Sequence, residues 1–247
     1  MSRYFIEVYY RGTNYSGFQI QQNANSIQAE IEKALKIFFR VEFTLTGASR
    51  TDAGVHALSN YFHFDSNALS RFDEDGLRKS VYNLNAILPA DIVIRRIYHV
   101  TDNAHCRFDA KGREYKYYIY QHKDPFHADR AYYYPYKLDF EVLQQVAGLL
   151  LSHHDFTSFS KRNTQVHTHD CTIVRSEWQW QGNLLVYNVL ANRFLRGMVR
   201  GLVGTMLKVG TGKLTVKGFS SVIESKDCVL ADFSVPPHGL FLAKVQY

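Results

Sequence analysis

The feature that most limits what this chain can fold into is the spacing of its apolar residues. Segments with strand-like alternation and segments with helical spacing follow one another in the same order in both halves of the 247 residues. In the first half, strand-like alternation comes first and helical spacing follows, with Asn25 and Gln28 as a predicted capping pair before the helix. The predicted segments are strand 3–10, helix 27–38, strands 41–46 and 61–64, helix 77–84 and strand 92–98. Their order is β-α-β-β-α-β.

The second half shows the same succession, with one more helix before its last strand. Its predicted segments are strand 114–120, helix 140–151, strands 172–180 and 184–191, helices 194–209 and 216–225, and strand 240–246. The order is that of the split β-α-β unit of ferredoxin-like and RNA-recognition domains. We therefore predict an α+β fold of two related domains, residues 1–104 and 105–247, with antiparallel sheets that form a central cleft.

Charge and cysteine content narrow the class of protein. Lys and Arg total 29 against 23 Asp and Glu, and the net charge of +6 favours a polyanionic partner. The three cysteines have no C-x-x-C spacing, which argues against a disulfide framework or a cysteine-rich zinc site. Because no long uncharged apolar run occurs, we expect no membrane or signal segment and a cytoplasmic location.

One segment of the first half lacks any core-forming pattern. Residues 47–57 read Gly-Ala-Ser-Arg-Thr-Asp-Ala-Gly-Val-His-Ala, so small residues surround Asp52 and allow a large ligand to approach the backbone. Arg50 could bind a phosphate or orient the carboxylate. An ordinary Asx-type turn has the same composition, and local sequence leaves both interpretations open.

Residues 50–57 resemble the motif of the TruA family of tRNA pseudouridine synthases. Similar family segments lie at 12–19, 88–92, 105–110, 113–117, 154–159, 192–200 and 239–247. The chain departs from the family pattern at Arg11, Phe18 and Ser49, and residues 164–172 lack the basic side chains typical of that segment. These departures could alter contacts with RNA.

The resemblance implies a homodimer that isomerises uridines 38, 39 and 40 of the tRNA anticodon stem-loop, which it binds in the cleft, without a metal or cofactor. It assigns Asp52 as the nucleophile, Tyr115 as the active-site tyrosine and Arg200 as the arginine that pairs with the carboxylate. By composition alone, Tyr115 is a packing residue and Arg200 a helix arginine that extends from an apolar face to solvent. The predicted substrate contacts are Arg50, Tyr115, Arg11, Arg107, Lys111, Arg113 and Arg196.

Two other functions remain open at this stage. One is a tRNA-binding or folding factor without catalysis, against which the presence of all three active-site residues counts. The other is a synthase that acts on a different RNA position. Whether Asp52 attacks C1′ or the base is also open.

Two further patterns are rejected. A histidine-rich stretch matches no compact zinc spacing; its residues are His153, His154, His167, His169, Asp170 and Cys171. Residues 210–214, Gly-Thr-Gly-Lys-Leu, lack the upstream glycine and the Ser or Thr of a phosphate loop, and we interpret them as a helix-terminating turn.

Overall fold

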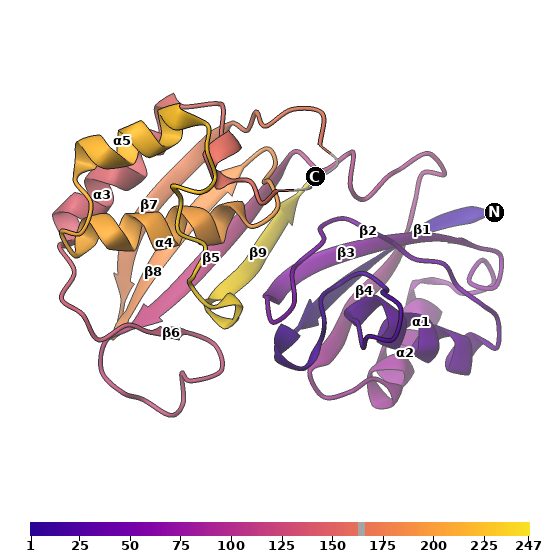
Figure 1. The fold of residues 1–247 in the computed structure, drawn as a ribbon. Coiled ribbons are helices and arrows are strands. Elements are labelled where there is room, and N and C mark those ends of the chain that lie inside the picture. The colour runs from indigo at the N-terminus through magenta and orange to yellow at the C-terminus, as the bar shows by residue number, and fades with distance from the viewer. Residues whose placement is uncertain (163–165) are drawn as a thin grey trace. The chain divides into compact units, whose positions relative to one another are not determined.

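The computed structural model describes residues 1–162 and 166–247, which form nine strands and five α-helices in a mixed α+β fold (Figure 1). The predicted α+β class is therefore confirmed. Internal contacts divide the chain into two units. Unit 1 comprises Met1–Lys111 together with Leu242–Tyr247, and unit 2 comprises Gly112–Phe241.

The sheet of unit 1 has three long antiparallel strands in the order β4-β1-β3. They are β1 (Ser2–Tyr10), β3 (His56–Ser66) and β4 (Ile92–Val100). The short β2 (Thr46–Gly47) also pairs with β3, and β9 (Leu240–Gln246), whose last residues belong to this unit, lies next to β3. Along β1, the side chains of Tyr4, Ile6, Val8 and Tyr10 are buried on one face, and Phe5 and Glu7 are buried on the other.

Two helices cover the core of unit 1, α1 (Ile27–Phe39) and α2 (Glu74–Ile87), and they pack beside each other (Figure 1). The predicted Asn25–Gln28 cap is wrong. Ser26 is the capping residue, because its backbone is extended and its hydroxyl oxygen accepts a hydrogen bond from the Ala29 N–H at 3.3 Å. The helix begins one residue later than the capping pair indicated.

The predicted strand 41–46 is also wrong, since only Thr46 and Gly47 pair with β3. Apolar residues in this segment are buried without strand pairing: the Phe43 ring lies 5.6 Å from that of Phe39 and 5.3 Å from that of Phe64. The Leu45 N–H donates to a Glu32 carboxylate oxygen at 2.9 Å. A side chain of α1 thus takes the place of a neighbouring strand.

Unit 2 is built on three antiparallel strands in the order β5-β8-β7. They are β5 (Gly112–Tyr120), β7 (Ile173–Gln181) and β8 (Leu184–Ala191). Gly182, with φ of 61°, helps to close the turn that joins β7 to β8. A two-residue strand that the sequence did not predict, β6 (Tyr132–Tyr133), pairs in parallel with the end of β5.

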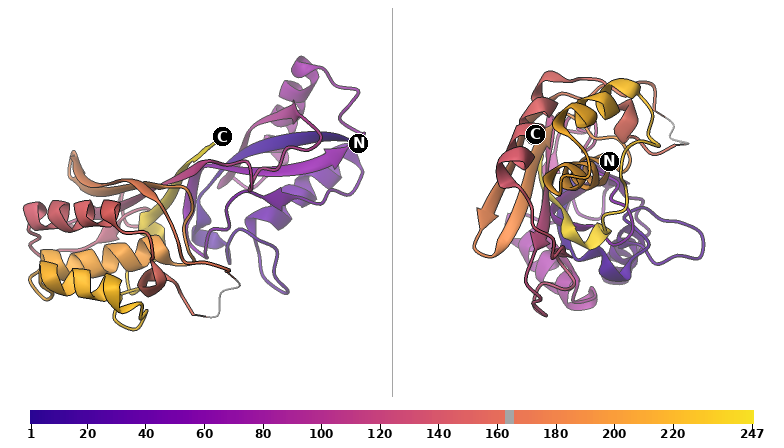
Figure 2. Two further views of the ribbon diagram at one scale, coloured as in Figure 1. Left: turned by 90° about the horizontal axis from the view of Figure 1, so that it is seen from above. Right: turned by 60° about the vertical axis from the view of Figure 1, so that its left-hand side comes forward.

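Three helices lie on one face of these strands (Figure 2): α3 (Phe140–Leu149), α4 (Met198–Gly210) and α5 (Val216–Ser225). The predicted start of α4 at Phe194 is wrong by four residues. Gly197 has φ of 77°, and the Asn192 side chain accepts hydrogen bonds from the N–H groups of Thr172 and Arg193, so residues 192–197 form a turn after β8. No helix in the described ranges is long and apolar enough to cross a membrane.

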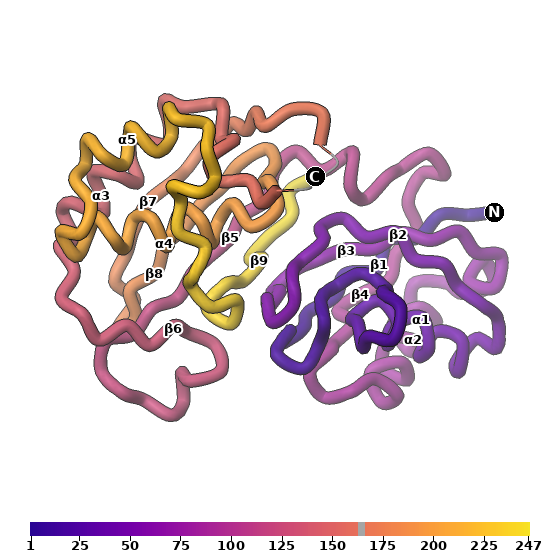
Figure 3. Tube along the Cα trace, in the orientation of Figure 1, coloured from indigo at the N-terminus to yellow at the C-terminus, as the bar shows by residue number. Residues whose placement is uncertain are grey.

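The helix-terminating role predicted for residues 210–214 is confirmed. α4 ends at Gly210, and Gly212 has φ of 73°. The N–H of Leu214 returns to the Lys208 carbonyl at 3.1 Å. The irregular segment that joins α5 to β9 can be followed as the yellow trace in Figure 3.

Candidate active site

Asp52 lies in the loop between β2 and β3 of unit 1, and its side chain is half-buried. The Ala48 N–H donates to the Tyr61 carbonyl at 2.7 Å, which keeps the start of the loop on the edge of β3. The Val55 N–H donates to the Asp52 carbonyl at 3.2 Å, and Gly54 adopts φ of 77°. The carboxylate therefore sits on a tight turn with buried residues before and after it.

A buried polar network fixes this loop from below. The Tyr10 hydroxyl lies 2.8 Å from the Thr51 hydroxyl, and the Asn60 amide donates to the Tyr10 oxygen at 3.1 Å and to the Ser49 carbonyl at 2.9 Å. Both backbone neighbours of Arg50 are thus held. Tyr10 and Asn60 were not predicted as site residues, because their burial and their hydrogen bonds exist only in the folded sheet.

The segment after β1 packs against the same loop. A Cβ atom added to Gly12 would lie 2.0 Å from the Val55 carbonyl oxygen, so only glycine fits there. The Gly12 N–H donates to Nδ1 of the buried His56 at 3.0 Å, which means that this ring nitrogen carries no proton. The Phe18 N–H donates to the Thr51 carbonyl at 3.1 Å. Residues 12–18 are therefore part of the support of Asp52.

The departures from the family pattern have different consequences. Phe18 is 1% exposed and stacks on Phe62 with ring centroids 4.4 Å apart, so its ring is part of the packed core of unit 1. Ser49 is 8% exposed, and its backbone carbonyl belongs to the network under the loop. Arg11 is exposed, and its N–H donates to the Asp91 carbonyl at 2.9 Å. Thr164 and Gln165, in the segment that lacks the basic side chains typical of the family, lie outside the described residues.

Tyr115 is on β5 of unit 2, opposite Val189 of β8. It is half-buried, and its ring meets that of Phe194 edge to face at 5.0 Å. By contrast, Tyr117 is fully buried, its hydroxyl donates to the Pro236 carbonyl at 2.8 Å, and burial raises its pKa. Burial also raises the pKa of Tyr118. Among these three tyrosines, Tyr117 is therefore the core packing residue.

Arg200 lies in the first turn of α4 and is half-buried. Its Nε donates to the Val235 carbonyl at 2.8 Å, and one terminal nitrogen donates to the Phe233 carbonyl at 3.2 Å. Both carbonyls belong to the irregular segment before β9 (Figure 3). The guanidinium is therefore held in one place by two of its five N–H groups, unlike an arginine that extends freely into solvent.

Basic residues gather at the start of α4. Arg113 donates from its guanidinium to the Asn192 carbonyl at 3.1 Å, and the Lys161 N–H donates to the Arg196 carbonyl at 3.0 Å. The described first turn of α4 holds no acidic side chain, although the helix dipole favours negative charge there. This arrangement is suited to an anion such as a phosphate group.

The remaining predicted substrate residues lie in unit 1. They are all exposed and are Arg11, Arg50, Arg107 and Lys111. Asp52 likewise belongs to unit 1, whereas Tyr115, Arg200, Arg113 and Arg196 belong to unit 2. The predicted residues thus fall into two groups. One lies in unit 1 with the Asp52 loop, and the other lies in unit 2, on β5 and near the start of α4.

Comparison with known proteins gives a consistent result. Residues 6–109 and 146–247 match the family model described as tRNA pseudouridine synthase. The chain is 46% identical over 250 residues to tRNA pseudouridine synthase A of Parabacteroides distasonis, covering 100% of this chain and 96% of that protein. The protein of the same name from Bacteroides thetaiotaomicron is 45% identical, with 100% and 91% covered.

A more distant relative extends the similarity beyond that group. The tRNA pseudouridine synthase A of Exiguobacterium is 38% identical over 247 residues, and the match covers 100% of this chain and 98% of that protein. The matched segments include the Asp52 loop, and the second of them includes Arg196 and Arg200. The chain therefore belongs to the tRNA pseudouridine synthases, the family of isomerases that convert uridine in tRNA to pseudouridine.

Proposed function

We propose that this chain isomerises uridines 38, 39 and 40 of the tRNA anticodon stem-loop, with Asp52 as the nucleophile. The observation that carries the proposal is the Asp52 loop itself. It holds a half-buried carboxylate on a turn whose neighbours Ser49 and Thr51 are fixed by the buried Tyr10–Asn60 network. A group held in this way can meet a reacting atom without first losing conformational freedom.

The reaction gives the carboxylate a definite task. The bond from N1 to C1′ breaks, the base turns, C5 bonds to C1′, and the proton that leaves C5 is balanced by one gained at N1. Asp52 can attack either C1′ or the base, and in both cases its oxygen is released when the new bond is complete. No net oxidation or hydrolysis takes place.

We assign the other two residues to the same uridine. Tyr115 is the acceptor of the C5 proton, which is supported by its half-buried position on β5, where Phe194 orients the ring. Arg200 pairs with the Asp52 carboxylate and keeps it ionised in a site from which water is excluded. The fixed guanidinium of Arg200 supports this role, because an arginine bound at one edge loses little freedom when it binds an anion at another.

Binding of the RNA is assigned to both halves of the chain. We propose that the two units are the two predicted RNA-recognition-like domains, and that the protein is a cytoplasmic homodimer. The target uridine is flipped from its stack, at a cost of a few kcal/mol. The basic cluster at the start of α4, together with Arg11, Arg50, Arg107 and Lys111, supplies contacts to the phosphates that offset this cost.

Asp52→Asn tests the proposal. We expect no release of tritium from C5-labelled tRNA and no pseudouridine in carbodiimide-dependent primer extension, while tRNA affinity stays within about tenfold of that of the wild type. Asp75→Asn, at a residue whose side chain is 73% exposed on α2, is the matched control and should retain full activity.

Each other outcome has a distinct meaning. Turnover by Asp52→Asn would remove the nucleophile assignment. A wild-type protein that binds tRNA but releases no tritium would be a binding factor, and pseudouridine at another position would identify a synthase of different specificity. Sedimentation velocity tests the dimer.

A further inference from the structure

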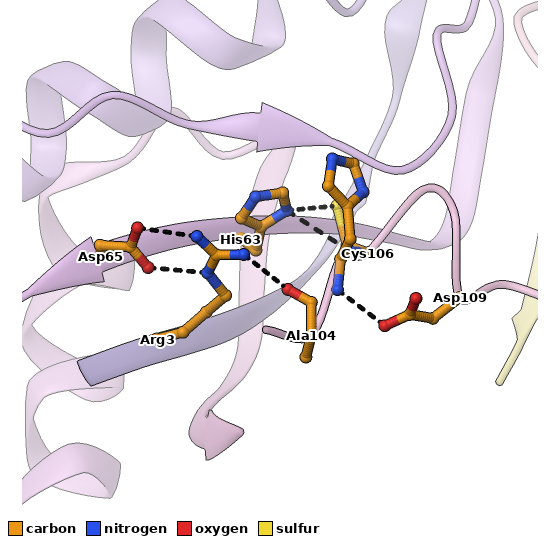
Figure 4. A network of polar contacts seen from close by, with 7 residues as sticks. Arg3, His63, Asp65, Ala104, Cys106 and Asp109 are labelled. Carbon is orange, nitrogen blue, oxygen red and sulfur yellow. Dashed lines mark hydrogen bonds and ion pairs between the residues drawn. The ribbon is translucent and has the colours of Figure 1, made fainter. Parts of the chain in front are cut away.

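The segment that follows β4 in unit 1 is tied to the sheet by charged groups (Figure 4). The Arg3 guanidinium binds both carboxylate oxygens of Asp65, at 2.7 and 2.8 Å, and also donates to the Ala104 carbonyl at 2.9 Å. Asp109 accepts a hydrogen bond from the His105 N–H at 2.7 Å. These contacts fix both ends of a short turn, residues 105–109.

The middle of this turn is anchored in the core through Cys106, which is fully buried. Its sulfur lies 3.2 Å from Nδ1 of His63 and donates to the Thr46 carbonyl at 3.1 Å. The Tyr247 hydroxyl donates to the Cys106 carbonyl at 2.8 Å. Because Thr46 belongs to β2, the strand from which the chain enters the Asp52 loop, the turn and that loop share one support.

Three rings continue outward from this anchor. The His63 and His105 centroids are 4.5 Å apart, and His105 and Phe108 are 4.2 Å apart with their planes tilted by 34°. The Arg107 guanidinium carbon lies 5.6 Å from the Phe108 centroid. His63 is buried, His105 is half-buried and Phe108 is 74% exposed, so the column begins in the core and ends at the surface.

We propose that the exposed ring of Phe108 is a stacking platform for an unpaired base of the tRNA, and that Arg107, whose guanidinium lies over that ring, is a cationic contact to the same nucleotide. This inference rests on the proposed function, since it takes tRNA as the ligand. An aromatic ring that already packs on His105 loses less freedom on binding than a ring without a neighbour, and every base has a face that can stack on it. The guanidinium favours RNA over an uncharged partner.

The platform would also let one site bind anticodon loops of different sequence. Stacking requires only an unpaired base and tolerates any sequence, in contrast to hydrogen bonds to base edges. A loop nucleotide held on Phe108 would therefore keep the RNA at the site whatever bases surround the target uridine. Phe108 is thus a positioning residue, and its effect should fall on binding.

The test compares three substitutions of Phe108 by the affinity of an anticodon stem-loop RNA measured in filter binding. Phe108→Ala should raise Kd between about 5-fold and 150-fold, the range for loss of one aromatic platform. Phe108→Trp should bind like the wild type, and Phe108→Leu should resemble Phe108→Ala because it has no aromatic face. Tyr82→Ala, at a residue 78% exposed on α2, is the control and should leave Kd unchanged.

A second readout follows the base itself. 2-Aminopurine placed in turn at each loop position should be quenched on binding at one position in the wild type, and Phe108→Ala should abolish that quenching. Wild-type affinity in Phe108→Ala, or affinity retained by Phe108→Leu, would overturn the stacking role. A change of oligomeric state without a change in Kd would place Phe108 at a protein contact and overturn it equally.

The inference and the proposed function fail separately. Tritium release by the wild-type protein tests the function without reference to Phe108. If the wild type is inactive but Phe108→Ala loses affinity for RNA, the platform stands and the function falls. If the wild type is active and Phe108→Ala binds normally, the reverse holds.

Discussion

Tyr10→Phe removes a single hydroxyl group from beneath the Asp52 loop and leaves the aromatic packing of β1 intact. That hydroxyl contacts the Thr51 hydroxyl at 2.8 Å and accepts from the Asn60 amide at 3.1 Å. Each such bond contributes about 1 kcal/mol, and the loss leaves the buried Thr51 hydroxyl without this partner. We therefore expect the free energy of unfolding to fall by about 2 kcal/mol.

The effect on catalysis should be larger than the effect on binding. A displacement of about 1 Å at a reacting group can lower a rate 100-fold, so the single-turnover rate of tritium release should fall between about 10-fold and 100-fold. The Kd for tRNA should remain within about twofold, because the Tyr10 side chain is buried and makes no contact with RNA. The predicted pattern is a slower enzyme with normal affinity.

Tyr4→Phe is the matched control. Tyr4 is on the same strand and is also buried, but its hydroxyl makes no hydrogen bond to another residue in the described ranges. Urea unfolding should be followed by far-UV circular dichroism and by hydrogen exchange at Ala48 and Val55, since both tryptophans, Trp178 and Trp180, lie in unit 2. Equal stability and equal rates in the two variants would refute the supporting role of the network.

Two further predictions concern single side chains. Tyr115→Phe should bind tRNA normally, but its turnover should be lowered by about 100-fold or more, the usual scale for loss of a general base. A wild-type single-turnover rate would leave Tyr115 as a stacking residue only. Burial, with the nearby charges of His105 and Arg3, lowers the pKa of His63 from its ordinary value of 6.5 to about 4, against the opposing effect of Asp65 and Asp109. Because His63 binds a proton more readily in the unfolded chain, stability present above about pH 6.5 should be lost as pH falls towards 4. In His63→Gln, the urea midpoint of unfolding should depend less on pH over that window. An unchanged pH dependence would contradict this cause.

Long periodic segments could be predicted from the sequence because their side-chain pattern and their burial have the same cause. The strand 184–191 and the helix 216–225 have the predicted bounds. Prediction failed where the local sequence is compatible with two structures. Asn25 and Ser26 are both good caps, and only the extended backbone at Ser26 decides between them.

Tertiary contacts account for the other errors. Apolar alternation over 41–46 satisfies the core as well in a loop as in a strand, because a Glu32 carboxylate accepts the N–H of Leu45. Residues 194–197 continue a helical pattern, but the Asn192 side chain closes a turn there and Gly197 starts the helix later. The spacing of apolar residues along the sequence does not indicate side-chain hydrogen bonds of this kind.

Of the candidate site, the sequence could indicate the loop that carries Asp52 but not its support. The loop stands out because it has no core pattern, and it lies within the segment that matches the family model. Tyr10 and Asn60 lie 42 and 8 residues from Asp52 in the sequence, and they support its loop only once the sheet has folded. Their types fit a strand as well as a site, so the geometry was needed to find them.

The discontinuity of unit 1 has a consequence for the order of events during synthesis. Its first 111 residues leave the ribosome long before Leu242–Tyr247, which belong to the same unit. The Tyr247 ring packs 5.5 Å from Phe5 and 5.1 Å from Tyr61, and its hydroxyl binds the Cys106 carbonyl. The unit that is translated first is therefore completed only after residues 242–247 have been made, and until then Phe5 of β1 and Tyr61 of β3 lack the ring that packs against them.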